Sequence, residues 1–368
     1  MCQHFFADRK RDASLVLTPF TQFLKNGWRL YFHATFRRQL FHSTLSYPLG
    51  DDVQKNRRQF LQMATAGAVG ATLASCAGMP TAPEPKQRTF VFSHGAFYGA
   101  WAFQPTIEQL VARGHRAVAL DLPGHGLNAR FPSSYFQRPL DNAKFGTEPS
   151  PSASITLEDN VKAVVKTIDA AMKGGSGPVV LVGHSMSGVI ISAVAEKHPE
   201  KIAKLVYLTA FLPKSGVPAI AYIQSPENKG DKVGAVIKAD PAKVGAIRVD
   251  QNSTDPTYVR ANKDAFAGEL DDAAWRAVSN LTVPDAPIQP FVTPVTLTVE
   301  KWGRVPRAYI QCNWDNAIRP ALQEKMIDDA DAATPNNKTQ VVALDASHSG
   351  AFLSDPKGLA AALEEVAG

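Results

Sequence analysis

Short apolar runs rich in β-branched residues alternate with longer amphipathic stretches over most of this chain. Such an alternation is typical of an α/β protein with a mostly parallel sheet and helices on both faces. The apolar runs predict strands at 89–93, 116–121, 178–182, 204–209, 307–312 and 339–344. The stretches between them have apolar residues three and four positions apart and predict helices at about 104–113, 157–173, 187–198, 318–331 and 357–366.

Two segments interrupt this alternation. Residues 217–305 are rich in Ala, Asp, Pro and Lys and carry helical patterns near 255–280, which predicts an inserted helical cap between core parts at 88–216 and 306–368. Residues 127–154 are too long for an ordinary connection, and long loops in compact domains are usually functional or disordered. The second segment contains four aromatic residues, Phe131, Tyr135, Phe136 and Phe145.

The distribution of charge argues against a nucleic-acid partner. The chain of 368 residues is 45% hydrophobic and 20% charged, which excludes collagen-like, coiled-coil and wholly disordered proteins. Residues 1–76 hold ten Lys and Arg against four Asp and Glu, whereas the remainder holds 29 against 30. The basic excess therefore belongs to the leader, and the nearly neutral body has no electrostatic basis for binding a phosphate backbone.

The leader carries the pattern of an export signal. Arg57 and Arg58 precede Phe60, and an Ala- and Gly-rich run at 64–74, too short to span a bilayer, leads to Cys76. The arginine pair resembles a bacterial twin-arginine signal, and the Leu-Ala-Ser-Cys ending resembles a lipoprotein box, which implies acylation of Cys76. The alternative is a basic pair ahead of an alanine-rich helix.

These patterns divide the start of the chain and imply a location. We expect a signal at 53–76 and a Pro-rich linker at 77–87, preceded at 1–52 by an uncharacterised extension or a misassigned start. The resemblances imply export to a bacterial periplasm or anchoring there as a lipoprotein. The three cysteines, Cys2, Cys76 and Cys312, have no metal-ligand spacing and form no disulfide framework, so no metal is expected.

A serine follows the predicted strand at 178–182. That strand runs into Gly183-His184-Ser185-Met186-Ser187-Gly188 and then into a helix. A serine on a sharp strand-to-helix turn projects its hydroxyl from the sheet, and small neighbours permit that turn. The alternative is a Gly-rich turn that merely joins strand and helix. We interpret Ser185 as a candidate nucleophile, with Ser187 in the place of the second glycine of the Gly-x-Ser-x-Gly pattern.

A histidine and an aspartate follow two later strands. Serine needs a base within hydrogen-bond reach and an acid that orients the base. His348 follows the strand at 339–344, and Asp315 follows the strand at 307–312. The carboxyl ends of the strands of a parallel sheet form the ligand-binding edge, so we expect the three side chains to meet there. Asp345 is the rival acid, but it lies only three residues before His348.

Acyl transfer also needs two N–H donors for the oxyanion. The strand predicted at 89–93 is followed by His94-Gly95-Ala96-Phe97-Tyr98-Gly99-Ala100-Trp101, and the position of Ala96 suggests one donor. The residue after the nucleophile, Met186, suggests the other.

These segments, with Asp121-Leu122-Pro123-Gly124-His125-Gly126, resemble the α/β-hydrolase superfamily. The resemblance covers roughly 89–215 and 306–368 and is nearest to the branch of plant methyl-ester esterases, hydroxynitrile lyases and bacterial pyrethroid-type esterases. It implies an α/β-hydrolase fold with an inserted cap. The lyases carry Thr and Lys where this chain has Gly95 and Ser349, which favours hydrolysis over cyanohydrin cleavage.

We therefore expect a serine esterase that cleaves small apolar or aromatic carboxylic esters through an acyl-enzyme, with no cofactor. The alternatives are a ligand-binding lipoprotein with vestigial activity or none, and a hydroxynitrile-lyase-like enzyme, and lactones, thioesters and amides remain open as substrates. The oligomeric state is not indicated. Aromatic residues beside the catalytic segments are the candidates for substrate binding, with core packing as the alternative role: Phe97, Tyr98, Trp101, Phe211, Trp314 and Phe352.

Overall fold

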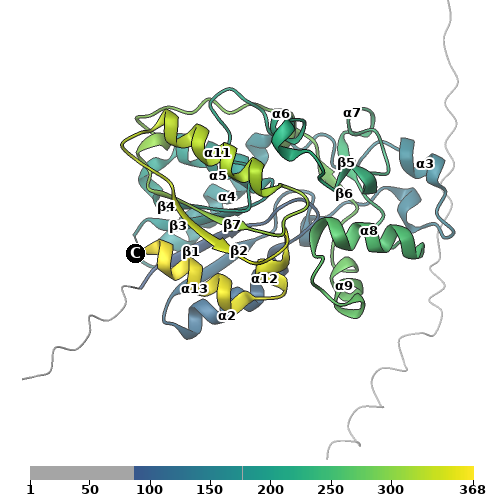
Figure 1. Cartoon of the computed structure of the whole chain (residues 1–368), viewed down its shortest axis with the longest axis horizontal. Helices are drawn as coiled ribbons and strands as arrows, with labels where there is room; N and C mark the ends of the chain where they lie inside the picture. The colour runs from purple at the N-terminus through teal and green to yellow at the C-terminus, as the bar shows by residue number, and fades with distance from the viewer. Residues whose placement is uncertain (1–86, 176) are drawn as a thin grey trace, which may run out of the picture. The chain divides into compact units, whose positions relative to one another are not determined.

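Six parallel strands form the central sheet in the order β2-β1-β3-β4-β7-β8 (Figure 1). The computed structural model describes residues 87–175 and 177–368. The predicted parallel sheet is confirmed, and each predicted strand lies within two residues of an observed one. The strands are β1 (Thr89–Ser93), β2 (Arg116–Leu120), β3 (Val179–His184), β4 (Ile202–Leu208), β7 (Arg307–Cys312) and β8 (Gln340–Leu344).

Helices cover both faces of this sheet, as the sequence predicts (Figure 1). The two groups of helices contribute to separate apolar clusters, one on each face. On one face lie α4 (Leu157–Met172), α5 (Ser187–Lys197) and α11 (Pro320–Ala333). On the other lie α2 (Gln104–Ala112), α12 (Gly350–Leu353) and α13 (Pro356–Ala367).

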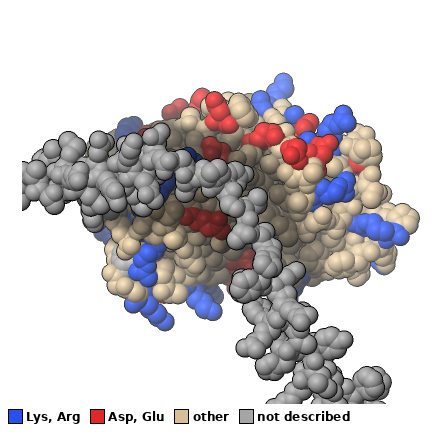
Figure 2. Space-filling view, turned by 90° about the horizontal axis from the view of Figure 1, so that it is seen from below, with Lys and Arg blue, Asp and Glu red and all other residues tan. Residues whose placement is uncertain are grey.

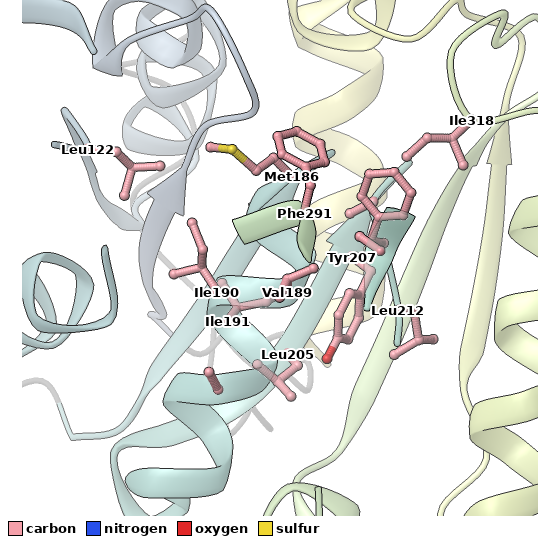
Figure 3. Close-up of a cluster of buried hydrophobic side chains, with 14 of the residues drawn as sticks. Leu122, Met186, Val189, Ile190, Ile191, Leu205, Tyr207, Leu212, Phe291 and Ile318 are labelled. Atoms are coloured by element: carbon pink, nitrogen blue, oxygen red, sulfur yellow. The ribbon is translucent and has the colours of Figure 1, made fainter. Parts of the chain in front are cut away.

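Successive side chains along each strand point to opposite faces of the sheet and so contribute to the two cores in turn. In β4, Leu205 and Tyr207 point to the α5 face, while Val206 and Leu208 point to the α13 face. Figure 3 shows apolar side chains of α5, among them Ile191, beside those of β4. The central strands β1, β3, β4 and β7 are mostly buried, whereas the edge strands β2 and β8 are partly exposed. The loops at the carboxyl edge therefore start from a sheet that is packed at its centre.

Residues 217–305, which we call the intervening segment, connect β4 to β7 without adding a strand to the central sheet. The helical patterns predicted near 255–280 correspond to α8 and α9. A two-stranded antiparallel sheet of β5 and β6 was not predicted, because strands of three residues are too short to show periodicity. The boundaries predicted for the two core parts and for the cap remain predictions. The elements are α6 (Ala219–Ile223), α7 (Pro241–Val244), β5 (Ala246–Arg248), α8 (Pro256–Phe266), α9 (Asp272–Ser279), β6 (Asp285–Pro287) and α10 (Gln289–Val292).

The irregular residues 127–154 contain the short helix α3 (Asn142–Thr147). They contact the intervening segment, where the N–H of Ser150 donates to the carbonyl oxygen of Val244 at 2.8 Å. The fully buried Arg248 and Asp285 form a bidentate ion pair. Arg248 Nε lies 2.7 Å from Asp285 Oδ1, and Arg248 Nη2 lies 2.7 Å from Asp285 Oδ2. Arg248 Nη1 also donates to the carbonyl oxygens of Phe145 and Glu148. One guanidinium thus joins β5, β6 and α3.

Removing the carboxylate from this pair should destabilise the fold. We expect Asp285→Ala to lower the free energy of unfolding by about 3–5 kcal/mol, because it leaves Arg248 charged and buried without its partner. Urea denaturation measures the change. Asp329→Ala, which removes the partly exposed ion pair with Lys325, is the control and should cost only about 0.3–0.5 kcal/mol. Equal stability of the two variants would contradict the prediction.

Two buried histidines lie at the carboxyl ends of β1 and β2. His94 Nδ1 donates to the carbonyl of Gly95 at 2.7 Å, and its Nε2 accepts from the N–H of Leu122 at 3.1 Å. The His125 ring lies 5.0 Å from the His94 ring, centroid to centroid. Burial lowers the pKa of His94 from 6.5 to about 4. Burial and the neighbouring His94 lower the pKa of His125 to about 3.

These lowered pKa values predict acid instability. In the unfolded chain both imidazoles take up protons below pH 6.5, whereas the folded protein resists protonation until about pH 4 at His94. The contribution of the two neutral histidines to the free energy of unfolding is therefore fully present above pH 6.5. Below pH 6.5 the free energy of unfolding falls by up to about 1.4 kcal/mol per pH unit for each histidine. Urea denaturation between pH 7 and 4.5 measures this slope. His125→Gln should make it shallower, and the control His198→Gln, at a partly exposed histidine, should not; a flat wild-type profile would refute the prediction.

The predicted leader, including Cys2, Cys76 and the linker up to residue 86, lies outside the described residues. Cys312 is buried as a free thiol. Within the described part of the chain, none of the helices has the length and apolarity needed to cross a membrane. On the face drawn in Figure 2, basic side chains occur singly or in small groups, with acidic side chains elsewhere on the same face.

Candidate active site

Backbone strain gathers at the carboxyl edge of the sheet. Among the described residues, only three other than glycine have a φ angle in the left-handed region: Phe97 (71°), Ser185 (55°) and Thr209 (36°). They follow β1, β3 and β4. Such angles are unfavourable for side chains with a Cβ and persist where the surroundings impose them. Ser185 lies between the end of β3 and the start of α5, on the sharp turn that the sequence predicted.

The structure brings Ser185, His348 and Asp315 together. The Ser185 hydroxyl donates to His348 Nε2 over 2.9 Å, and His348 Nδ1 donates to Asp315 Oδ2 over 2.7 Å. All three residues are buried, Ser185 being 7% exposed. An imidazole that bridges a hydroxyl and a carboxylate can take a proton from the hydroxyl while the carboxylate stabilises the resulting charge.

The Asp315 carboxylate is held by four donors. Oδ1 accepts from the backbone N–H groups of Ala317 at 2.6 Å and Ile318 at 2.9 Å. Oδ2 accepts from His348 and from the hydroxyl of Thr209. This satisfies a fully buried carboxylate and fixes its orientation. The rival acid Asp345 instead accepts a hydrogen bond from the Asn313 side chain at 2.7 Å.

The two predicted oxyanion donors are free to serve a ligand. In the described part of the chain, neither the N–H of Ala96 nor that of Met186 has a hydrogen-bond acceptor. The loop with Ala96 is braced against α5 by Ser187, whose hydroxyl donates to the carbonyl of His94 and lies 2.8 Å from the Ser93 hydroxyl. The serine in place of the motif's second glycine therefore links the two loops that carry the donors.

Two further residues pack closely around the triad. His184 Nε2 lies 3.0 Å from the carbonyl oxygen of His348, and its ring centroid lies 4.7 Å from the His348 ring. Burial and the nearby His348 hold the pKa of His184 well below 6.5, so His184 adds no charge. A Cβ atom at Gly95 would lie 2.6 Å from His184 Nδ1 and 2.7 Å from Ser185 Cβ. The packing thus leaves no room for a threonine at this position.

The aromatic residues predicted to bind substrate divide into three groups. Phe97 and Phe211 belong to the apolar cluster on the α5 face, together with Met186. Tyr98 and Phe352 instead belong to the core on the α13 face, with Trp101 packed against it. Trp314 is 54% exposed. The six residues are predicted because they lie near the ends of strands in the sequence. That position does not specify the face of the sheet toward which a side chain points, so the residues divide among the two cores and the surface.

The intervening segment adds residues that sequence reasoning missed. The Phe266 ring lies 5.8 Å from Phe97 and 6.1 Å from His348, centroid to centroid. The Phe291 ring lies 6.1 Å from Phe211. No motif marks these two residues. Thr209, by contrast, is the last residue of the strand predicted at 204–209, and that position at the carboxyl end of a strand could have identified it.

The described residues contain no group of three or more His, Cys, Asp or Glu side chains arranged to hold a metal ion.

Relatives with curated names include esterases. Methyl jasmonate esterase 1 of Vitis vinifera is 26% identical over 292 residues, which cover 77% of this chain and 98% of the relative. Salicylic acid-binding protein 2 of Nicotiana tabacum is 26% identical over 281 residues, which cover 76% of this chain and 96% of the relative.

Solved structures agree with the predicted fold class. A pyrethroid hydrolase is similar with a TM-score of 0.57 and 25% identity, over 76% of this chain and 97% of that one. Polyneuridine aldehyde esterase has a TM-score of 0.57 at 20% identity, over 77% of this chain and all of that one, which bears on the fold alone. The predicted α/β-hydrolase fold is confirmed. A family model described as alpha/beta hydrolase family matches residues 90–362, so the chain belongs to that family.

Proposed function

We propose that this protein is a serine hydrolase of carboxylic esters. The observation that carries the proposal is the unbroken hydrogen-bond chain from Ser185 through His348 to Asp315. Relatives named as esterases over most of this chain support the same reaction type. The close packing of Gly95 against Ser185 and His184 favours hydrolysis over lyase chemistry.

In the acylation step, the Ser185 oxygen attacks the ester carbonyl carbon while His348 Nε2 takes the hydroxyl proton. Negative charge then develops on the former carbonyl oxygen, where the N–H groups of Ala96 and Met186 would donate to it. His348 next gives its proton to the departing alkoxide, and the carbon–oxygen bond to the alcohol breaks. Asp315 stabilises the imidazolium throughout.

In the deacylation step, His348 takes a proton from a water molecule, whose oxygen attacks the acyl-enzyme carbonyl. The bond to Ser185 breaks, and the serine oxygen recovers the proton from His348, so the carboxylic acid leaves and the enzyme returns to its starting state. Both steps need the imidazole to start neutral and with its Nδ1 proton toward Asp315. The hydrogen bond of 2.7 Å between Nδ1 and Oδ2 favours that tautomer.

The substrates we propose are esters of small apolar or aromatic compounds. The supporting residues are apolar side chains of the cluster on the α5 face: Met186, Phe97 with Phe266, and Phe211 with Phe291. Aromatic rings favour flat apolar groups over charged ones. An ester panel that varies chain length and aromaticity tests this class.

Replacing the proposed nucleophile should abolish turnover. We expect Ser185→Ala to lower kcat for a p-nitrophenyl ester by about 10⁶-fold, because the remaining groups cannot form an acyl-enzyme. The exposed-serine control Ser354→Ala should keep wild-type activity. A fluorophosphonate probe should label the wild type and Ser354→Ala, but not Ser185→Ala.

Retention of more than a few per cent activity in Ser185→Ala would refute the assignment of the nucleophile. A wild-type protein that neither labels nor hydrolyses any ester of the panel would favour a ligand-binding protein on this fold instead.

We also propose that the protein is exported and anchored through an acylated Cys76. The arginine pair and the Leu-Ala-Ser-Cys sequence support this proposal. Mass spectrometry of the mature protein in a bacterial host should find an N-terminal peptide that begins at lipid-modified Cys76. A mature N-terminus within residues 1–52 would contradict the proposal, and Cys76→Ala should release the protein from membranes.

A further inference from the structure

The intervening segment forms hydrogen bonds to both residues that flank His348 in the sequence. The Phe266 carbonyl oxygen accepts from the N–H of Ser349 at 2.8 Å and from the hydroxyl of Ser347 at 3.2 Å. The carboxylate of Glu269 accepts from the N–H of Ser347 at 2.9 Å. Both neighbours of His348 along the chain are thus bonded to a short stretch about eighty residues away, at the end of α8.

The same stretch also contacts the loop of Asp315. The side-chain amide of Asn316, the next residue, donates to the carbonyl oxygen of Asp264 at 2.9 Å. Residues 264–269, which we call the strap, therefore hold the two loops whose side chains form the 2.7 Å hydrogen bond between imidazole and carboxylate. A displacement of one loop relative to the other would lengthen that bond.

We propose that Glu269 is a positioning residue for His348, a role that rests on the triad proposed above. Glu269 does not touch the reacting atoms. Its carboxylate is the one side-chain group of the strap that bonds the His348 loop, and a charged acceptor makes a stronger hydrogen bond to a backbone N–H than a neutral one. The contribution of Glu269 is to keep the imidazole aligned with both Ser185 and Asp315.

Gly350 supports this assignment. A Cβ atom built at Gly350 would lie 1.6 Å from Glu269 Oε1, so the carboxylate lies directly over the glycine. The φ angle of Gly350 is not in the left-handed region, so an alanine there is compatible with the backbone. Because Gly350 has no side chain, the Glu269 carboxylate has room to reach the N–H of Ser347.

Substitution of Glu269 should lower turnover without weakening substrate binding. We expect Glu269→Ala to lower kcat about 10- to 100-fold with KM nearly unchanged, because a small misplacement of a catalytic group has effects of this size. Glu269→Gln should restore most of kcat, since its amide oxygen can still accept from Ser347. Glu300→Ala removes an exposed carboxylate of the same intervening segment and should leave kcat unchanged.

Gly350→Ala gives an independent test that leaves Glu269 in the chain. The added methyl group must displace the carboxylate, so we expect the same loss of kcat as in Glu269→Ala. The double variant should then be no slower than either single variant, because both changes remove the same hydrogen bond. Losses that multiply would overturn the proposal.

A spectroscopic measurement separates positioning from a general loss of stability. The proton between His348 Nδ1 and Asp315 should give a proton NMR signal far downfield of the amide region in the wild type. We expect this signal to shift or broaden in Glu269→Ala and Gly350→Ala at a temperature where both remain folded, and to persist in Glu300→Ala. An unchanged signal with unchanged kcat in Glu269→Ala would overturn the role of Glu269.

Fluorophosphonate labelling distinguishes this failure from that of the proposed function. If wild-type Ser185 labels and esters are hydrolysed, an unaffected Glu269→Ala variant removes the positioning role alone. If wild-type Ser185 neither labels nor turns over esters, the hydrolase proposal fails, and the positioning role fails with it.

Discussion

The hydrogen bond between His348 and Asp315 is the interaction on which the site depends. It joins two loops that follow different strands, β8 and β7, and it fixes which imidazole nitrogen faces Ser185. The carboxylate can stay buried because it has four donors, two of them backbone N–H groups of its own loop. An incompletely satisfied carboxylate at this depth would be costly, so the surrounding donors are part of the site.

The rigid sheet and the intervening segment position the site together. The central strands β1, β3, β4 and β7 are mostly buried, and the hydrogen-bonded sheet that they form with β2 and β8 sets where each loop begins. The intervening segment forms hydrogen bonds to these loops beyond the ends of the strands. The N–H of Val283 donates to the carbonyl oxygen of Phe97, and the strap accepts hydrogen bonds from Ser347 and Ser349. Phe97 keeps an unfavourable φ angle where its carbonyl oxygen accepts that bond.

The buried histidines show how polar groups are kept neutral near a catalytic imidazole. His94, His125 and His184 are all buried, and the pKa of each lies below its ordinary value mainly because burial disfavours the charged form. Their neutrality at neutral pH leaves His348 without a charged imidazole nearby. The same burial makes the fold sensitive to acid, so one property has consequences for both stability and catalysis.

The sequence by itself determined the order of strands and helices, because apolar periodicity reflects burial within each element. It also determined Ser185, Asp315 and His348 as candidates, since each directly follows a predicted strand. It did not separate Phe211 on the α5 face from Phe352 in the core on the other face. Only the tertiary structure decided that separation and the contacts of Phe266 and Glu269, because these depend on how a long segment folds back onto the sheet, and neighbouring residues carry no pattern for such distant contacts.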